Sequence, residues 1–77
     1  MPHISVKLWP GKTEEEKIEL TDKFVRAMEE IMGVPERSIS VAIEEVPKEL
    51  WTEQVYNTDI MGKPENLYKK PGYTPSV

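Results

Sequence analysis

Two short segments of alternating apolar and polar residues flank one long amphipathic segment, and this order constrains the fold more than any other feature of the chain. In residues 2–8 and again in residues 38–44, apolar side chains occupy every second position. That period of two predicts strands with one apolar face. Between them, residues 13–33 carry apolar side chains at spacings of three and four, which predicts an amphipathic helix.

The ends of the predicted helix carry residues that are typical of helix caps. Thr13 followed three positions later by Glu16 forms a capping-box pattern, in which each side chain accepts a hydrogen bond from the backbone N–H of the other residue. Gly33 is a stop signal, because glycine readily adopts the left-handed conformation that ends many helices. The predicted apolar stripe comprises Leu20, Phe24, Met28 and Ile31, with Val25 and Met32 beside it.

A strand, a helix and a second strand predict an α+β protomer, a β-α-β unit with two parallel strands, in a single domain over residues 1–77. One helix covers one face of such a sheet and leaves the other face without a partner. A chain of 77 residues buries little core by itself, and without cysteine it forms no disulfide. We therefore expect a second subunit to cover that face.

Charge and hydropathy argue against several classes of partner. A formal net charge of −4 leaves no basic stripe to neutralise phosphates, so we expect no nucleic-acid partner. No apolar run approaches the roughly 20 residues of a membrane span, and the amino terminus has no signal-peptide pattern, so we expect a cytoplasmic protein without a membrane partner. A single histidine, His3, and no cysteine argue against a metal site.

Pro2 is the residue with the most unusual chemistry. Removal of Met1 would convert the Pro2 nitrogen from an amide into a secondary amine at the end of a strand. Amino-terminal amines have pKa values of about 7.7–8.0, and apolar surroundings lower the pKa of an amine. An amine with a pKa near neutrality both accepts and returns a proton, which is what moving a proton between the oxygen and the carbon of an enol requires.

Residues 2–8, 11–17 and 38–46, in this order and at this spacing, resemble the 4-oxalocrotonate tautomerase family. The tail, with Trp51 and residues 69–73, is similar to the PptA-type branch of that family, so that the resemblance covers nearly the whole chain. It implies β-α-β protomers that pair into a four-stranded sheet, and an isomerase whose amino-terminal proline shuttles the proton of 2-oxo acid enols. It also implies no cofactor. The PptA-type branch implies a homodimer, whereas the shorter members of the family form hexamers, which is the alternative assembly.

Four residues fall on functional positions of that family. Pro2 corresponds to its catalytic proline. Lys12 stands where the family has an arginine before the helix, and it keeps the charge but loses the two-pronged guanidinium. Ser40 stands where the family has a second arginine, and Trp51 where it has a pocket phenylalanine. The resemblance thus implies substrate-binding positions at Lys12, Ser40 and Trp51. It also implies a substrate with one carboxylate and an aromatic or apolar body, such as phenylenolpyruvate.

Two other functions stay open from the sequence. A proline-based hydratase or dehalogenase would keep the fold, but it needs a carboxylate beside Pro2 to activate water. A non-catalytic binding or structural module would follow if Met1 were retained, because the Pro2 nitrogen would then be an amide.

Overall fold

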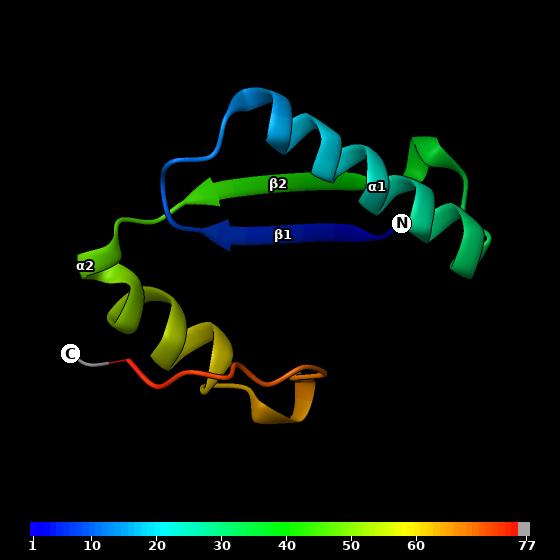
Figure 1. Ribbon diagram of the computed structural model, residues 1–77. Helices are drawn as coiled ribbons and strands as arrows, with labels where there is room; N and C mark the ends of the chain where they lie inside the picture. The colour runs from blue at the N-terminus through cyan, green and yellow to red at the C-terminus, as the bar shows by residue number, and fades with distance from the viewer. Residues whose placement is uncertain (76–77) are drawn as a thin grey trace. The chain divides into compact units, whose positions relative to one another are not determined.

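The computed structural model describes residues 1–75, which divide into two compact units, the first Met1–Glu45 and the second beginning at Val46. The first unit contains strand β1 (His3–Leu8), helix α1 (Glu14–Met32) and strand β2 (Ser40–Glu45). The strands are parallel, in a register that pairs His3 with Ser40 and Leu8 with Glu45. Figure 1 shows α1 running alongside both strands. The predicted β-α-β unit is confirmed.

Both predicted caps of α1 are present. The backbone N–H of Glu16 donates to the Thr13 hydroxyl at 3.1 Å, and the backbone N–H of Thr13 donates to the Glu16 carboxylate at 2.9 Å. The hydrogen bond from the Thr13 backbone, and after it a bond from the Thr13 hydroxyl to the same carboxylate at 3.3 Å, hold the pKa of Glu16 below its ordinary value. At the other end Gly33 is left-handed (φ 67°), and its N–H donates to the Glu29 carbonyl at 3.1 Å. The helix therefore begins and ends where the sequence predicts.

The second strand begins two residues later than predicted, because a short 3₁₀ helix, η1 (Glu36–Ser38), occupies the residues before it. The backbone N–H and the hydroxyl of Ser38 both donate to the Pro35 carbonyl, at 3.0 and 2.8 Å. Because the backbone N–H of Ser38 is bonded to Pro35, it is not available to the hydrogen-bond ladder between the strands. Serine often forms such local bonds. The alternation in sequence did not reveal this competition.

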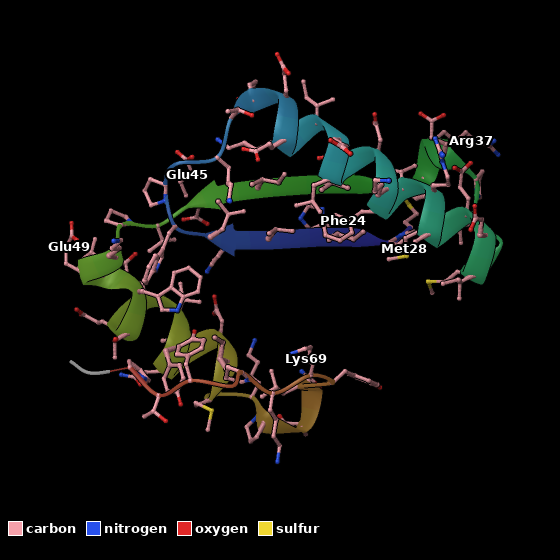
Figure 2. All side chains as sticks on the ribbon, viewed as in Figure 1. Phe24, Met28, Arg37, Glu45, Glu49 and Lys69 are labelled. Carbon is pink, nitrogen blue, oxygen red and sulfur yellow. The ribbon has the colours of Figure 1, made fainter. Side chains whose placement is uncertain are left out.

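No side chain of the first unit is fully buried. Among residues 1–75 only Val46 and Val55 are fully buried, at 2% and 4% exposure, and both belong to the second unit. Figure 2 shows Phe24 and Met28 on the side of α1 that faces the strands, where both are half-buried. The prediction that Ile31 belongs to the covered stripe is wrong, because its side chain is 83% exposed. A 19-residue helix is about 28 Å long and a six-residue strand about 20 Å, so the last helical turn extends beyond the sheet.

The second unit contains α2 (Lys48–Trp51), a π-helix η2 (Thr52–Ile60) and a 3₁₀ helix η3 (Pro64–Asn66). Pro47 directly precedes α2 and Pro64 begins η3, whereas the π-helix was not predicted. Its hydrogen bonds span five residues, as between the Met61 N–H and the Tyr56 carbonyl at 2.8 Å. In residues 1–75 no helix is both long and apolar enough to cross a bilayer.

Candidate active site

Pro2 is held at the start of β1 by the second strand. Its carbonyl accepts a hydrogen bond from the backbone N–H of Ser40 at 3.2 Å, which extends the ladder by one bond before the strand begins. The Pro2 side chain is half-buried, and Met1 in front of it is fully exposed. The ladder thus fixes the backbone that carries the Pro2 nitrogen, while the residue that blocks this nitrogen is accessible.

Ser40 lies beside Pro2, and its side chain contacts a histidine to which the sequence analysis gave no catalytic or binding role. The Ser40 hydroxyl and the Nδ1 atom of His3 are 2.7 Å apart, and the two residues face each other in the strand register. Both side chains are exposed, on the face of the sheet opposite to Ile4 and Val41. Matching the two strands from their first residues would have revealed this pair.

An apolar pocket opens near the same end of β1. It has a volume of about 210 Å³ and is lined by one residue of β1, Ile4, and by five residues of the second half of α1, namely Phe24, Ala27, Met28, Ile31 and Met32. Pro2 and Ile4 are two positions apart, so the alternation of the strand puts them on the same face. The half-buried Pro2 therefore shares a face with Ile4, although Pro2 is not itself among the residues that line the pocket.

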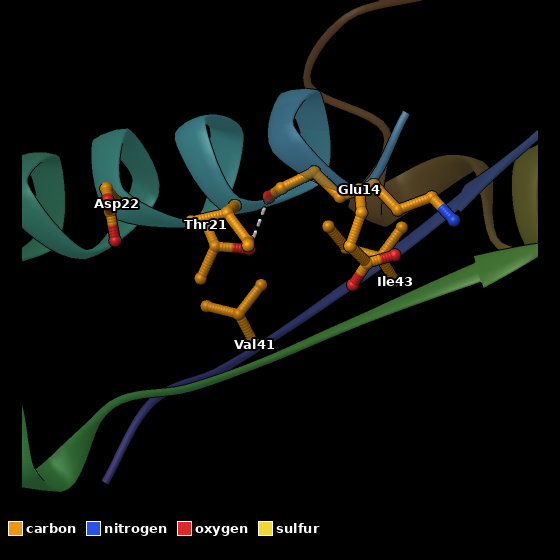
Figure 3. Close-up of a pocket in the computed structure, with 7 residues that line it drawn as sticks. Glu14, Thr21, Asp22, Val41 and Ile43 are labelled. Carbon is orange, nitrogen blue, oxygen red and sulfur yellow. Dashed lines mark hydrogen bonds between the residues drawn. The ribbon is translucent and has the colours of Figure 1, made fainter. Parts of the chain in front are cut away.

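A second, larger pocket lies between α1 and β2, and Figure 3 shows it in close-up. Its volume is about 360 Å³; Val41 and Ile43 of β2 line its floor, and Glu14 and Asp22 are among the residues of α1 that line it. The dashed line in Figure 3 is the hydrogen bond from the Thr21 hydroxyl to the Lys17 carbonyl at 2.8 Å. The ammonium of Lys17 also forms an ion pair with the carboxylate of Glu45 at 3.0 Å. Figure 2 labels Glu45. Both carboxylates that line this pocket, Glu14 and Asp22, belong to α1.

Lys12 is not brought to Pro2 within one chain. Its exposed side chain belongs to the loop that follows β1, whereas Pro2 precedes that strand. Six residues of extended strand separate the two positions by roughly 20 Å. A single protomer therefore does not assemble the predicted combination of Pro2 and Lys12.

Trp51 is the last residue of α2, in the second unit, and it is half-buried. Its indole N–H donates to the hydroxyl of Tyr73 at 2.9 Å. The tail of the chain thus contacts the residue that the sequence analysis placed in the pocket. Neither the hydrogen bond nor the folding back of the tail was predicted.

The described part of the chain, residues 1–75, contains no group of three or more histidine, cysteine, aspartate or glutamate side chains arranged to hold a metal ion. Near the start of β1, the imidazole of His3 and the hydroxyl of Ser40 lie on one face of the sheet, whereas Pro2 lies on the face of Ile4.

Comparison with known proteins identifies the family. The family profile described as "Tautomerase enzyme" matches residues 2–55. A probable tautomerase of Xylella fastidiosa is 42% identical over 73 residues, which is 95% of this chain and 89% of that protein. Tautomerase PptA of Cronobacter sakazakii is 35% identical over 74 residues, which is 95% of this chain and 97% of that protein.

Two solved structures support the same family assignment. The chain resembles TomN, a 4-oxalocrotonate tautomerase homologue in the tomaymycin biosynthetic pathway, with a TM-score of 0.63 and 34% identity over 65% of this chain and 77% of TomN. It also resembles YwhB, another 4-oxalocrotonate tautomerase homologue, with a TM-score of 0.59 and 40% identity over 61% of this chain and 77% of YwhB. The chain therefore belongs to the 4-oxalocrotonate tautomerase family, in its PptA-type branch, and its activity is of the tautomerase type.

Proposed function

We propose that this tautomerase interconverts enol and keto forms of 2-oxo acids, phenylenolpyruvate-like molecules in particular, with the amine of Pro2 as its general acid and base and without a cofactor. The observation that carries the proposal is the position of Pro2. The hydrogen bond from Ser40 at 3.2 Å holds its backbone at the start of β1, on the face where the apolar pocket lies.

Removal of Met1 creates the base. In the full chain the Pro2 nitrogen is an amide and has no proton-accepting lone pair, whereas in the processed chain it is a secondary amine. Apolar neighbours disfavour the ammonium form of an amine and thereby lower its pKa toward neutrality. The neutral amine takes the hydroxyl proton of the enol, and the resulting ammonium delivers a proton to C3. No atoms are gained or lost, which makes the reaction an isomerisation.

A second copy of the chain completes the site in this proposal. The first unit has no fully buried side chain, so association with another protomer would cover surface that one chain leaves exposed. In a two-fold antiparallel pair of β1 strands, the end of one strand lies beside the start of the other. That pairing would bring Lys12 of one protomer to Pro2 of the other, where its ammonium attracts the carboxylate of the substrate.

Ser40 and Trp51, the other two positions implied by the family resemblance, bear on the substrate class. Ser40 carries no charge, and its hydroxyl is bonded to His3 on the face opposite to Ile4, so the proposed site offers one cation, from Lys12, for one carboxylate. Trp51 provides an aromatic wall for the body of the substrate. An enol with one carboxylate and an aromatic ring fits this set better than a dicarboxylate does.

Loss of phenylenolpyruvate absorbance tests the proposal. We expect Pro2→Ala to lower kcat/KM at least about 10²-fold, the range of general acid–base catalysis. Pro35→Ala, at an exposed proline of the same unit, is the matched control and should keep the activity. Intact mass shows whether Met1 is absent. An unchanged rate in Pro2→Ala, or an active protein that retains Met1, would refute the role of the Pro2 amine.

A further inference from the structure

Three aromatic side chains from distant parts of the sequence meet in the second unit. The Trp51 indole N–H donates to the Tyr73 hydroxyl at 2.9 Å. The rings of Tyr73 and Tyr56 have their centroids 5.8 Å apart at an interplanar angle of 49°. Trp51 and Tyr56 are half-buried, and Tyr73 is 47% exposed. Tyr73 therefore contacts both other side chains and is the most exposed of the three.

The π-helix contributes to this arrangement. Trp51 ends α2 and Tyr56 lies five residues later, inside η2. A helix whose hydrogen bonds span five residues has more residues per turn than an α-helix, so side chains five positions apart lie closer to one face. This explains how one tail residue, Tyr73, contacts both rings. An α-helix over the same residues would turn Tyr56 away from Trp51.

We propose that Tyr73 is a positioning residue that holds the indole of Trp51 in one orientation and thereby tunes the preference for substrates with an aromatic body. The inference rests on the proposed function, in which Trp51 contacts the aromatic body of the substrate. The hydrogen bond restrains the orientation of the indole, and the tilted contact with Tyr56 restrains the Tyr73 ring that accepts this bond. Without Tyr73, the substrate has to order the indole when it binds, which weakens binding and leaves the proton transfer unaltered.

The decisive variant is Tyr73→Phe, which keeps the ring and removes the acceptor of the Trp51 N–H. Tyr68→Phe is the matched control, because Tyr68 is fully exposed. We expect Tyr73→Phe to raise KM for phenylenolpyruvate about threefold to tenfold and to change kcat by less than about twofold, whereas Tyr68→Phe changes neither. The KM for the enol of an aliphatic 2-oxo acid should change less.

Nuclear magnetic resonance provides a readout that does not depend on turnover. The chain has two tryptophans, so a Trp9→Phe variant assigns the indole N–H signal of Trp51. Tyr73→Phe should shift that signal, and titration with phenylpyruvate should show binding about threefold to tenfold weaker than in Tyr68→Phe. If the protein lacks tautomerase activity, this titration still tests the role of Tyr73.

The double variant excludes a general loss of structure. In a Trp51→Phe background, which has no indole N–H, Tyr73→Phe should have no further effect on KM or on phenylpyruvate binding. An equal effect in both backgrounds would overturn the proposal. So would an unshifted Trp51 signal in Tyr73→Phe, or phenylpyruvate binding that leaves the Trp51 signal unchanged in the natural protein.

Discussion

The separation of Pro2 and Lys12 along β1 makes a prediction about mixed dimers. Because roughly 20 Å of strand lies between them, the two residues cooperate only if they come from different protomers. A Pro2→Ala chain paired with a Lys12→Ala chain then contains one site with an intact Pro2 and an intact Lys12, and one site with neither. The mixed dimer should therefore regain about half of the natural activity, although each parent is impaired.

The parents set the scale of this recovery. Pro2→Ala replaces the rigid secondary amine of proline with a rotating primary amine and should lose at least about 10²-fold. Lys12→Ala loses a charged hydrogen bond to the carboxylate, worth about 1.5–3 kcal/mol, which corresponds to roughly a 10-fold to 100-fold lower kcat/KM. Half of the natural activity thus exceeds the better parent by fivefold or more. In an equal, unpurified mixture half of the dimers are mixed, and the expected recovery is about one quarter.

Co-expression of the two chains with different affinity tags isolates the mixed dimer, and phenylenolpyruvate absorbance measures its rate. The matched control pairs an unaltered chain with a chain that carries both substitutions. If Lys12 of one protomer acts with Pro2 of the other, this control should have low activity, because its intact Pro2 faces a chain without Lys12. If the control instead keeps half of the activity and the first mixture stays at the level of its parents, Lys12 does not act across the dimer and the strand argument is wrong.

The remaining predictions concern stability. Thr13→Ala should cost about 1 kcal/mol in urea unfolding, because it removes the hydroxyl that caps α1. The lowered pKa of Glu16 means that its carboxylate favours the folded state above the ordinary glutamate pKa of about 4.3, and that this contribution disappears as the pH falls through the lowered value. Unfolding curves of Glu16→Gln should therefore depend less on pH in that acidic range, and an unchanged dependence would argue against the cap as the cause. Gly62→Ala should destabilise the second unit, because a Cβ at Gly62 would overlap the Thr58 carbonyl oxygen, whereas Gly72→Ala has open space and should have little effect on thermal unfolding.

The parts of the fold that depend on local chemistry were predictable from the sequence. The cap at Thr13 and the stop at Gly33 need only a few neighbouring residues, and both are where the pattern placed them. The start of β2 was misplaced because Ser38 bonds to Pro35, an option that alternation does not reveal. The covered stripe was wrong at Ile31 because periodicity shows which side chains share a face, not how far the sheet beneath them extends.

The candidate site was predictable to a different degree at each position. Pro2 and Ser40 belong to the two strand starts, and the parallel register brings them together. Pro2 and Lys12 are far apart because they lie at opposite ends of β1. The family resemblance implied roles for both residues, but it did not assign them to different chains. The contact of Trp51 with Tyr73 joins residues 22 positions apart through an unpredicted π-helix, so no local pattern indicates it.

The absence of a fully buried side chain from the β-α-β unit has a consequence for how this protein responds to its own concentration. In a homodimer of such protomers, folding and association form one equilibrium, and dilution shifts it toward unfolded chains. Each tenfold increase in chain concentration adds about 1.4 kcal/mol to the stability of the dimer. The amount of protein that a cell synthesises would then determine both how many active sites exist and how long each one survives.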